Sequence, residues 1–305
     1  MIELKSVSRW YGPVIGVNDI SCTLQPGVTA LLGQNGAGKS TLMRLVTGQL
    51  RPTTGEVLVG GMDPFANPEA MKQIGFCPDI DSFPEHLTGR QFVNRMGRLM
   101  GYAGRAAIEK TQTLMDQVGM ADRCDKPLRG YSKGMRQRIK LAAALFHDPQ
   151  IILLDEPLNG LDPLGRREFM NVLHGLAQGG RTILVSSHIL FEVEQMTNSM
   201  LLMHRGRLLA SGNIRTIRDL IDAHPHRIRI VCSDPRHAAA ILAREAPIDS
   251  LSIGPAIDEL EVRTKQPDLL YDAIAKLVLE EGLEVERLDS PDNSLEAVFS
   301  YLVEG

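Results

Sequence analysis

The segment at residues 33–41, Gly-Gln-Asn-Gly-Ala-Gly-Lys-Ser-Thr, constrains the fold more than any other part of this chain. It matches the phosphate-loop pattern G-x-x-x-x-G-K-[ST], which joins a buried strand to a helix. Residues 28–32 are apolar enough for the strand, and residues 41–46 favour the helix. Glycines let the loop turn so that successive N–H groups face one concavity, where an anion binds. The motif therefore predicts an α/β fold that holds a nucleoside triphosphate.

The polar residues of this loop have chemical reasons to contact a triphosphate. Lys39 can reach the β- and γ-phosphates, and the hydroxyl of Ser40 can bind Mg²⁺. Backbone N–H groups at the start of the helix supply further donors. We expect the nucleotide to be bound by Gly33, Asn35, Gly36, Gly38, Lys39, Ser40 and Thr41.

The composition excludes several other kinds of protein. The 305 residues are 43% hydrophobic and 23% charged, as in globular domains, and the formal net charge is −4. The absence of a long basic run argues against a nucleic-acid partner. No apolar run approaches the roughly 18–20 residues that cross a bilayer, and the N-terminus lacks the apolar core of a signal peptide. The four cysteines are far apart and indicate buried thiols of a reducing compartment. We expect a cytoplasmic protein with no direct membrane span.

Apolar strands and helices alternate through the first two thirds of the chain. Short apolar runs at residues 151–154 and 182–185 predict buried strands, with helical patterns between and after them. A mainly helical stretch runs from Leu87 to about Phe146. This order is typical of an α/β protein with a parallel sheet. We expect a domain at residues 1–223 that includes a helical subdomain at about 80–146.

The composition changes after residue 212, and His-Pro-His at residues 224–226 marks a boundary. Beyond it the pattern predicts strand, helix, strand, strand, helix and strand up to residue 288, followed by a last helix at 294–303. This βαββαβ order favours a small α+β domain of the ferredoxin-like type at residues 224–305.

Two acidic residues follow the apolar run at residues 151–154. Ligands of open α/β sheets bind at the carboxyl ends of the strands, so Asp155 and Glu156 are placed to meet the nucleotide. Asp155 can hold Mg²⁺, and Glu156 can polarise the water that attacks the γ-phosphate. A strand that ends in an acidic turn is weak evidence alone, and its value here comes from the motifs around it.

The motifs, taken in order, resemble those of the nucleotide-binding subunits of ATP-binding cassette (ABC) transporters. The resemblance covers residues 1 to about 220. Residues 157–162, Pro-Leu-Asn-Gly-Leu-Asp, resemble the D-loop of this family. Residues 131–138, Tyr-Ser-Lys-Gly-Met-Arg-Gln-Arg, resemble its signature motif but depart from Leu-Ser-Gly-Gly-Gln at the first, third and fifth positions. This form looks like the branch that serves ABC-2-type exporters.

The resemblance implies a RecA-like P-loop ATPase core with ATP and Mg²⁺ as cofactors. It assigns catalysis to Lys39, Glu156 and His188, where His188 contacts the γ-phosphate. A lone histidine at a strand end is otherwise more often a structural residue. The implied metal contacts come from Ser40, Asp155 and Asp79.

Three further matches leave alternatives open. Tyr11 matches the aromatic residue that stacks on adenine; its neighbour Trp10 is a second candidate, and core packing is the alternative for both. Ser132 and Gly134 would contact the γ-phosphate of ATP on a second subunit, although Ser132 could serve only as a helix N-cap. Asp79 stands where the family has a glutamine that contacts Mg²⁺, so it either keeps an oxygen ligand or is a solvated turn residue.

We therefore predict an ATP-hydrolysing subunit that drives a separate integral membrane permease, as an exporter, through head-to-tail dimerisation. The second cassette would be an identical copy or a paired ABC subunit, and the protein would lie on the inner face of the membrane through its permease. One alternative is a soluble ABC-type ATPase that acts on ribosomes or DNA, which the single phosphate loop and the lack of heptads disfavour. Another is a regulatory module without turnover. For the C-terminal domain we expect regulation or dimer support.

Overall fold

The computed structural model describes residues 1–213, 226–254 and 258–290. The chain forms two compact units, Met1–Asn213 and Ile214–Gly305. The division falls before the expected domain boundary at residues 223/224, which lies outside the described residues, as does the expected last helix at 294–303.

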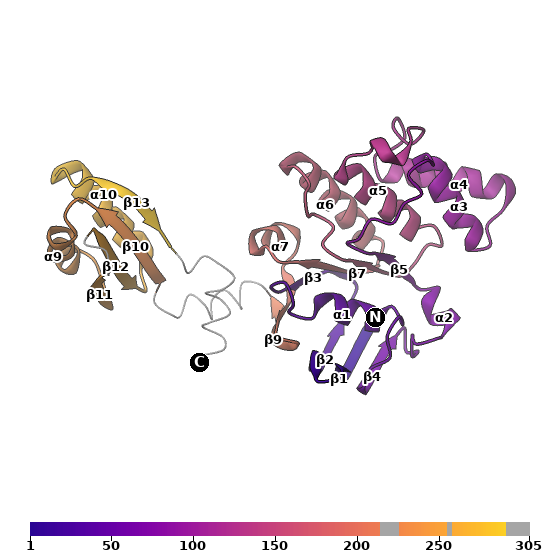
Figure 1. Ribbon diagram of the computed structural model, residues 1–305, viewed down its shortest axis with the longest axis horizontal. Helices are drawn as coiled ribbons and strands as arrows, with labels where there is room; N and C mark the ends of the chain where they lie inside the picture. Colours follow the sequence, from indigo (N-terminus) through magenta and orange to yellow (C-terminus); the bar gives the residue numbers. More distant parts are fainter. Residues whose placement is uncertain (214–225, 255–257, 291–305) are drawn as a thin grey trace. The chain divides into compact units, whose positions relative to one another are not determined.

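A six-stranded sheet forms the centre of the first unit (Figure 1). In spatial order its strands are β5 (Ile74–Cys77), β6 (Ile151–Leu154), β7 (Thr182–Ser187), β3 (Gly27–Leu32), β8 (Ser199–His204) and β9 (Arg207–Asn213). Neighbours from β5 to β8 run parallel, and β9 is antiparallel to β8. Strands β3, β6 and β7 are buried almost throughout, which explains their continuous apolar sequences.

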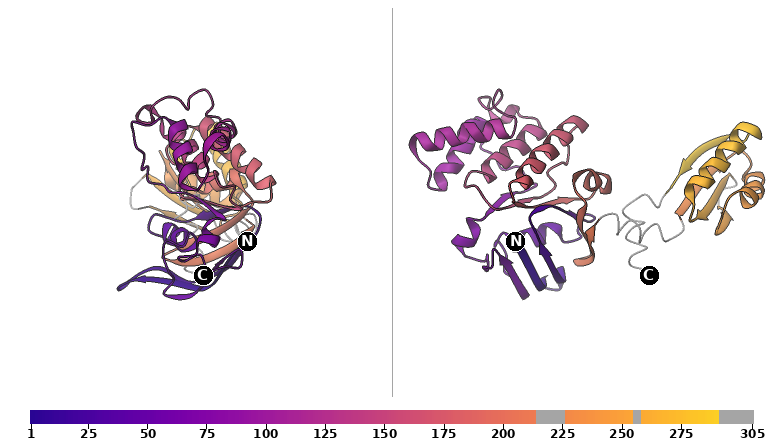
Figure 2. Two further views of the ribbon diagram at one scale, coloured as in Figure 1. Left: turned by 90° about the vertical axis from the view of Figure 1, so that its right-hand side faces the viewer. Right: turned by 180° about the vertical axis from the view of Figure 1, so that it is seen from behind.

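An antiparallel sheet lies on one side of this central sheet (Figures 1 and 2). Its strands, in spatial order, are β2 (Val14–Leu24), β1 (Ile2–Tyr11) and β4 (Thr54–Val59). Helix α1 (Lys39–Val46) buries Leu42 and Met43 in a core that also contains side chains of both sheets. Helix α1 follows β3 through the phosphate loop, so the predicted order of strand, loop and helix is confirmed.

Helices cover the other side of the central sheet (Figure 2). A capping box between Thr88 and Gln91 begins the first of them. They share a core that includes Val93, Met115 and Phe146. The helices of the first unit after α1 are α2 (Pro68–Met71), α3 (Gly89–Leu99), α4 (Gly104–Gln117), α5 (Lys133–Ala144), α6 (Pro163–Gln178) and α7 (Leu190–Met196).

The second unit has the predicted βαββαβ order. Its elements are β10 (His226–Cys232), α9 (Pro235–Glu245), β11 (Ser250–Ile253), β12 (Glu259–Thr264), α10 (Pro267–Glu280) and β13 (Val285–Asp289). The strands form one antiparallel sheet in the order β11-β12-β10-β13. Both helices contribute to a single core with the sheet, through residues such as Ile230, Leu242 and Leu277. This arrangement is ferredoxin-like, as the sequence predicts.

Candidate nucleotide site

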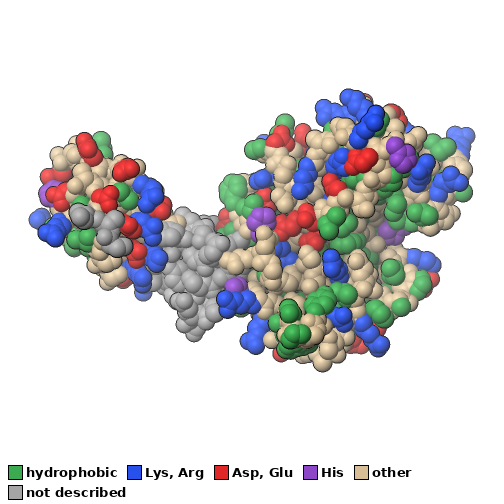
Figure 3. All heavy atoms as spheres, in the orientation of Figure 1, with side chains coloured by type: hydrophobic (Ala, Val, Ile, Leu, Met, Phe, Trp, Pro, Cys, Tyr) green, Lys and Arg blue, Asp and Glu red, His purple; other side chains and the backbone are tan. Residues whose placement is uncertain are grey.

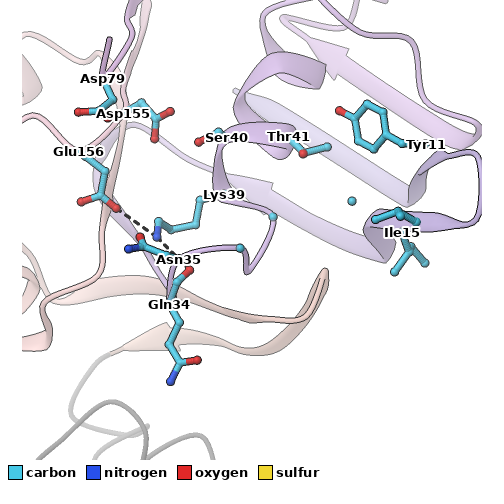
Figure 4. Close-up of a pocket in the computed structure, with 14 residues that line it drawn as sticks. Tyr11, Ile15, Gln34, Asn35, Lys39, Ser40, Thr41, Asp79, Asp155 and Glu156 are labelled. Carbon is cyan, nitrogen blue, oxygen red and sulfur yellow. Dashed lines mark hydrogen bonds and ion pairs between the residues drawn. The ribbon is translucent and has the colours of Figure 1, made fainter.

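A pocket of about 390 Å³ lies beside the phosphate loop, at the carboxyl ends of β5 and β6 (Figure 4). This is the edge of a parallel sheet at which ligands bind. Figure 3 shows acidic side chains gathered on the visible face of the first unit. The pocket brings together most of the predicted site residues, namely Tyr11, Asn35, Gly36, Gly38, Lys39, Ser40, Thr41, Asp79, Asp155 and Glu156.

The phosphate loop is held in shape by its glycines and by its own lysine. Gly36 and Gly38 adopt φ angles of 81° and 103°, which side chains strongly disfavour. A Cβ atom on Gly38 would also lie 2.4 Å from the carbonyl oxygen of Gly16. Lys39 is only 6% exposed. Its ammonium donates to the carbonyl oxygen of Gly33 at 2.6 Å. Gly33 thus contributes a carbonyl that holds Lys39 and does not line the pocket itself.

The acidic pair after β6 is fixed by a serine that the motifs did not single out. The hydroxyl of Ser186 donates to Oδ1 of Asp155 at 2.7 Å and accepts from the backbone N–H of Glu156 at 2.8 Å. Glu156 has a φ angle of 49°, in a left-handed region that costs a non-glycine residue about 1–3 kcal/mol. Ser186 lies on β7, beside β6, so only the sheet order reveals its role.

The carboxylate of Glu156 lies between two basic side chains. Its Oε1 is 3.1 Å from Nζ of Lys39, and its Oε2 is 2.9 Å from Nδ1 of His188. His188 follows the end of β7 and does not line the pocket, yet it reaches the pocket through Glu156. Lys39, Glu156 and His188, predicted separately from three motifs, therefore form one connected group.

The residues present fit a nucleotide-bound magnesium ion. Ser40, Asp79 and Asp155 all line the phosphate end of the pocket, and oxygen ligands suit this hard cation (Figure 4). In the described parts of the chain, no three His, Cys, Asp or Glu side chains cluster as a metal cage. Mg²⁺ matches this sparse set, because it is usually held by one or two carboxylates together with substrate phosphates and waters.

An aromatic residue stands at the opposite end of the pocket. The Tyr11 ring lines the pocket, is 40% exposed and has the Arg9 guanidinium 5.2 Å from its centroid (Figure 4). Trp10 is also exposed but does not line the pocket. Core packing therefore explains neither residue, and the geometry favours Tyr11 over Trp10 as the base-stacking candidate.

The signature residues lie apart from this pocket. Ser132 and Gly134 line a separate hollow of about 640 Å³, together with Asp162 and Gly165 at the start of α6. The hydroxyl of Ser132 accepts a hydrogen bond of 3.3 Å from the N–H of Met135, so Ser132 does cap α5. Within one chain, these residues do not meet the phosphate loop.

The loop after β5 is tied to α5 through a buried lysine. Nζ of Lys140 donates to the carbonyl oxygens of Pro78 and Asp79, at 2.8 and 3.1 Å, and pairs with Asp81 at 2.9 Å. Burial raises the pKa of the nearby Cys77 thiol to about 12. Asp79 is therefore held between the pocket and the helical subdomain.

Comparisons with known proteins agree with this site. The ABC transporter family matches residues 17–159. The bacitracin transport ATP-binding protein BcrA of Enterococcus faecalis is 30% identical over 308 residues, which span 100% of this chain and 97% of that protein. The daunorubicin/doxorubicin resistance ATP-binding protein DrrA of Streptomyces peucetius is 31% identical and covers 99% of this chain and 92% of its own length.

Solved structures show the same fold. The ATP-binding subunit of an ABC transporter superposes with a TM-score of 0.64 at 27% identity, over 72% of this chain and 92% of that chain.

The chain belongs to the family of ABC transporter ATP-binding proteins. It is an ATP-binding and ATP-hydrolysing subunit, as the sequence predicts, and the alternative of an ABC-type ATPase unconnected with transport is not supported. Across the described residues, every helix is too short or too polar to span a bilayer.

Proposed function

We propose that this chain powers an exporter, and that ATP closes two cassettes head to tail so that each nucleotide lies between the phosphate loop of one and the signature of the other. The separation of Ser132 and Gly134 from the phosphate pocket carries this proposal, because these residues line their own hollow within one chain. The relatives named for bacitracin transport and for daunorubicin resistance support export, since their similarity extends over the second unit as well.

At the phosphate end, a bound γ-phosphate competes with Glu156 for the ammonium of Lys39. Glu156 then keeps His188 as its partner and accepts a proton from the attacking water. Lys39 and the loop N–H groups stabilise the charge that develops on the phosphate oxygens. Ser40 and Asp155 would hold Mg²⁺, which would neutralise phosphate charge, and Asp79 is the further candidate ligand. Tyr11 stacks on the adenine.

The permease docks beside the loop that contains Asp79. A mostly apolar groove of about 240 Å³ lies between this loop and helices α3 and α5. Ile80, at its edge, is 71% exposed. Because Lys140 joins this loop to α5, movement of a permease segment in the groove is transmitted to both the pocket and the signature helix. This attachment holds the protein at the inner face of the cell membrane.

For the second unit, the proposed role is regulation or dimer support.

Glu156→Gln tests the proposal. The amide keeps the shape of the carboxylate but cannot take the proton, so ATP binding persists and hydrolysis falls by about 10²-fold or more. ATP then accumulates a dimer that size-exclusion chromatography with light scattering detects, whereas ADP does not. Hydrolysis at the parent rate, or no dimer with ATP, contradicts the proposal.

A further inference from the structure

A buried carboxylate that pairs with a partly exposed arginine lies outside the nucleotide pocket. Glu192 lies in the first turn of α7, and only 5% of its side chain is exposed. Its Oε1 is 3.1 Å from Nη1 of Arg166 on α6, as an ion pair that is not aligned as a hydrogen bond. A buried carboxylate is costly unless it is paired, and Arg166 is the basic partner of Glu192. Neither residue lines the nucleotide pocket.

The second oxygen of Glu192 fixes the strand end that carries His188. The hydroxyl of Ser187 donates to Oε2 of Glu192 at 2.8 Å and accepts from the backbone N–H of Ile189 at 3.0 Å. The carbonyl oxygen of Ser187 accepts from the N–H of Gly33, at 3.2 Å, in the phosphate loop. The residues on both sides of His188 are therefore held by one hydroxyl, and that hydroxyl is held by Glu192.

Arg166 extends these contacts to the segment after the acidic pair. Its Nε donates to the carbonyl oxygen of Leu161 at 3.0 Å. Leu161 lies in the segment 157–162 that follows Glu156 directly. A ring of contacts thus leads from Glu156 along this segment to Arg166, Glu192 and Ser187, and it closes through the bond between His188 and Glu156.

We infer that Arg166, Glu192 and Ser187 are positioning residues, which set the place of His188 against Glu156 and link it to the segment 157–162. The inference rests on the proposed function, since it presumes that His188 and Glu156 act at the γ-phosphate. A shift of the segment 157–162 would reach His188 through the ion pair of Arg166 with Glu192 and the hydroxyl of Ser187. A misplacement of about 1 Å at such a site can cost about 10²-fold in rate.

Glu192→Gln in the full chain tests the inference. The amide oxygen can still accept from Ser187, but the charge pairing with Arg166 is lost. We expect kcat for ATP hydrolysis to fall between about tenfold and about a hundredfold, with the Kd for ATP unchanged within about twofold. The matched control is Asp148→Asn, which breaks the ion pair with Arg181 at the other end of β7 and leaves kcat unchanged.

The decisive readout is a double-mutant cycle with His188→Ala. If Glu192 acts through His188, Glu192→Gln has no further effect on kcat in the His188→Ala background. An equal loss in both backgrounds, or a parent-like kcat in Glu192→Gln, overturns the inference. Ser187→Ala serves as the second variant if Glu192→Gln does not fold, with the same expected dependence on His188. A parent-like rate for His188→Ala itself contradicts the proposed role of His188, and the inference falls with it; a slow His188→Ala beside a fast Glu192→Gln overturns the inference alone.

Discussion

Helices α1 and α5 begin in opposite ways, although a phosphate contact is proposed for both. Helix α1 starts after Gly38, at φ 103°, and no side chain caps its first N–H groups. Helix α5 starts after Ser132, whose hydroxyl already bonds the N–H of Met135. The first N–H groups of a helix need acceptors, so the uncapped start of α1 is the stronger anion site. In the proposed site, α1 therefore supplies the stronger anion contact and α5 the weaker one.

The lysines at the two helix starts also differ, because the lysine of α1 is buried and that of α5 is exposed. Lys39 is buried, bonded to Gly33 and 3.1 Å from Glu156. Lys133 is exposed, and its aliphatic chain lies over Gly160, where an added Cβ would be 2.9 Å from Cδ of Lys133. Charge interactions are weaker in water than in a buried site, so Lys39 should stabilise a bound phosphate far more than Lys133 does.

The largest expected effect is that of Lys39→Ala. Loss of a buried charge beside the β- and γ-phosphates should lower hydrolysis by about 10²-fold or more and weaken ATP binding as well. Lys133→Ala is the matched control at the start of α5 and should lower hydrolysis much less. Calorimetry measures the binding, and a phosphate-release assay measures the turnover. Near-normal ATP binding by Lys39→Ala would contradict the assignment of the phosphate loop.

A partial recovery of ATPase activity, which is an effect of intermediate size, is expected when two inactive variants are mixed. Ser132→Arg blocks the start of α5, and Lys39→Ala disables the start of α1. If each site combines both helix starts from different chains, a heterodimer keeps one intact site, and the mixture recovers part of the parental ATPase rate. Light scattering and differential tags verify that heterodimers form. Heterodimers without activity would show that the two helix starts do not act in trans.

Removal of the second unit should have the smallest effect on nucleotide binding. Every described residue that lines the pocket belongs to Met1–Asn213, so a chain ending at Ala223 should bind ATP with the parental affinity. If the second unit supports the dimer, ATP-dependent dimerisation of the shortened chain weakens. Circular dichroism controls for folding. A folded chain without ATP binding would place part of the nucleotide site in the second unit.

Local motifs and the family resemblance identified most of the residues that line the pocket, but not Val14, Ile15 and Gly16. The phosphate loop, Asp155 and Glu156 each belong to a strand, turn or helix start that a few neighbouring residues define. The βαββαβ order of the second unit followed from the same alternation of apolar runs. Such features depend on the backbone conformation of short segments, which composition and spacing express well.

Contacts between segments far apart in the chain could not be predicted in this way. The bond from Ser186 to Asp155 exists because β6 and β7 are neighbours in the sheet, which no local pattern specifies. The carbonyl oxygen of Gly16, on β2, lies close to Gly38 of the phosphate loop for a similar reason. The pairing of Glu156 with both Lys39 and His188 depends on the order of three parallel strands.

The bonds from Lys39 to the carbonyl oxygens of Gly33 and Gln34 have a consequence for the kinetics of association. They belong to the chain itself, so the loop is held by contacts with its own lysine. A preorganised loop loses little conformational entropy when ATP arrives, and this favours affinity. The association rate should then be set by diffusion into the pocket, with loop folding contributing no slow step.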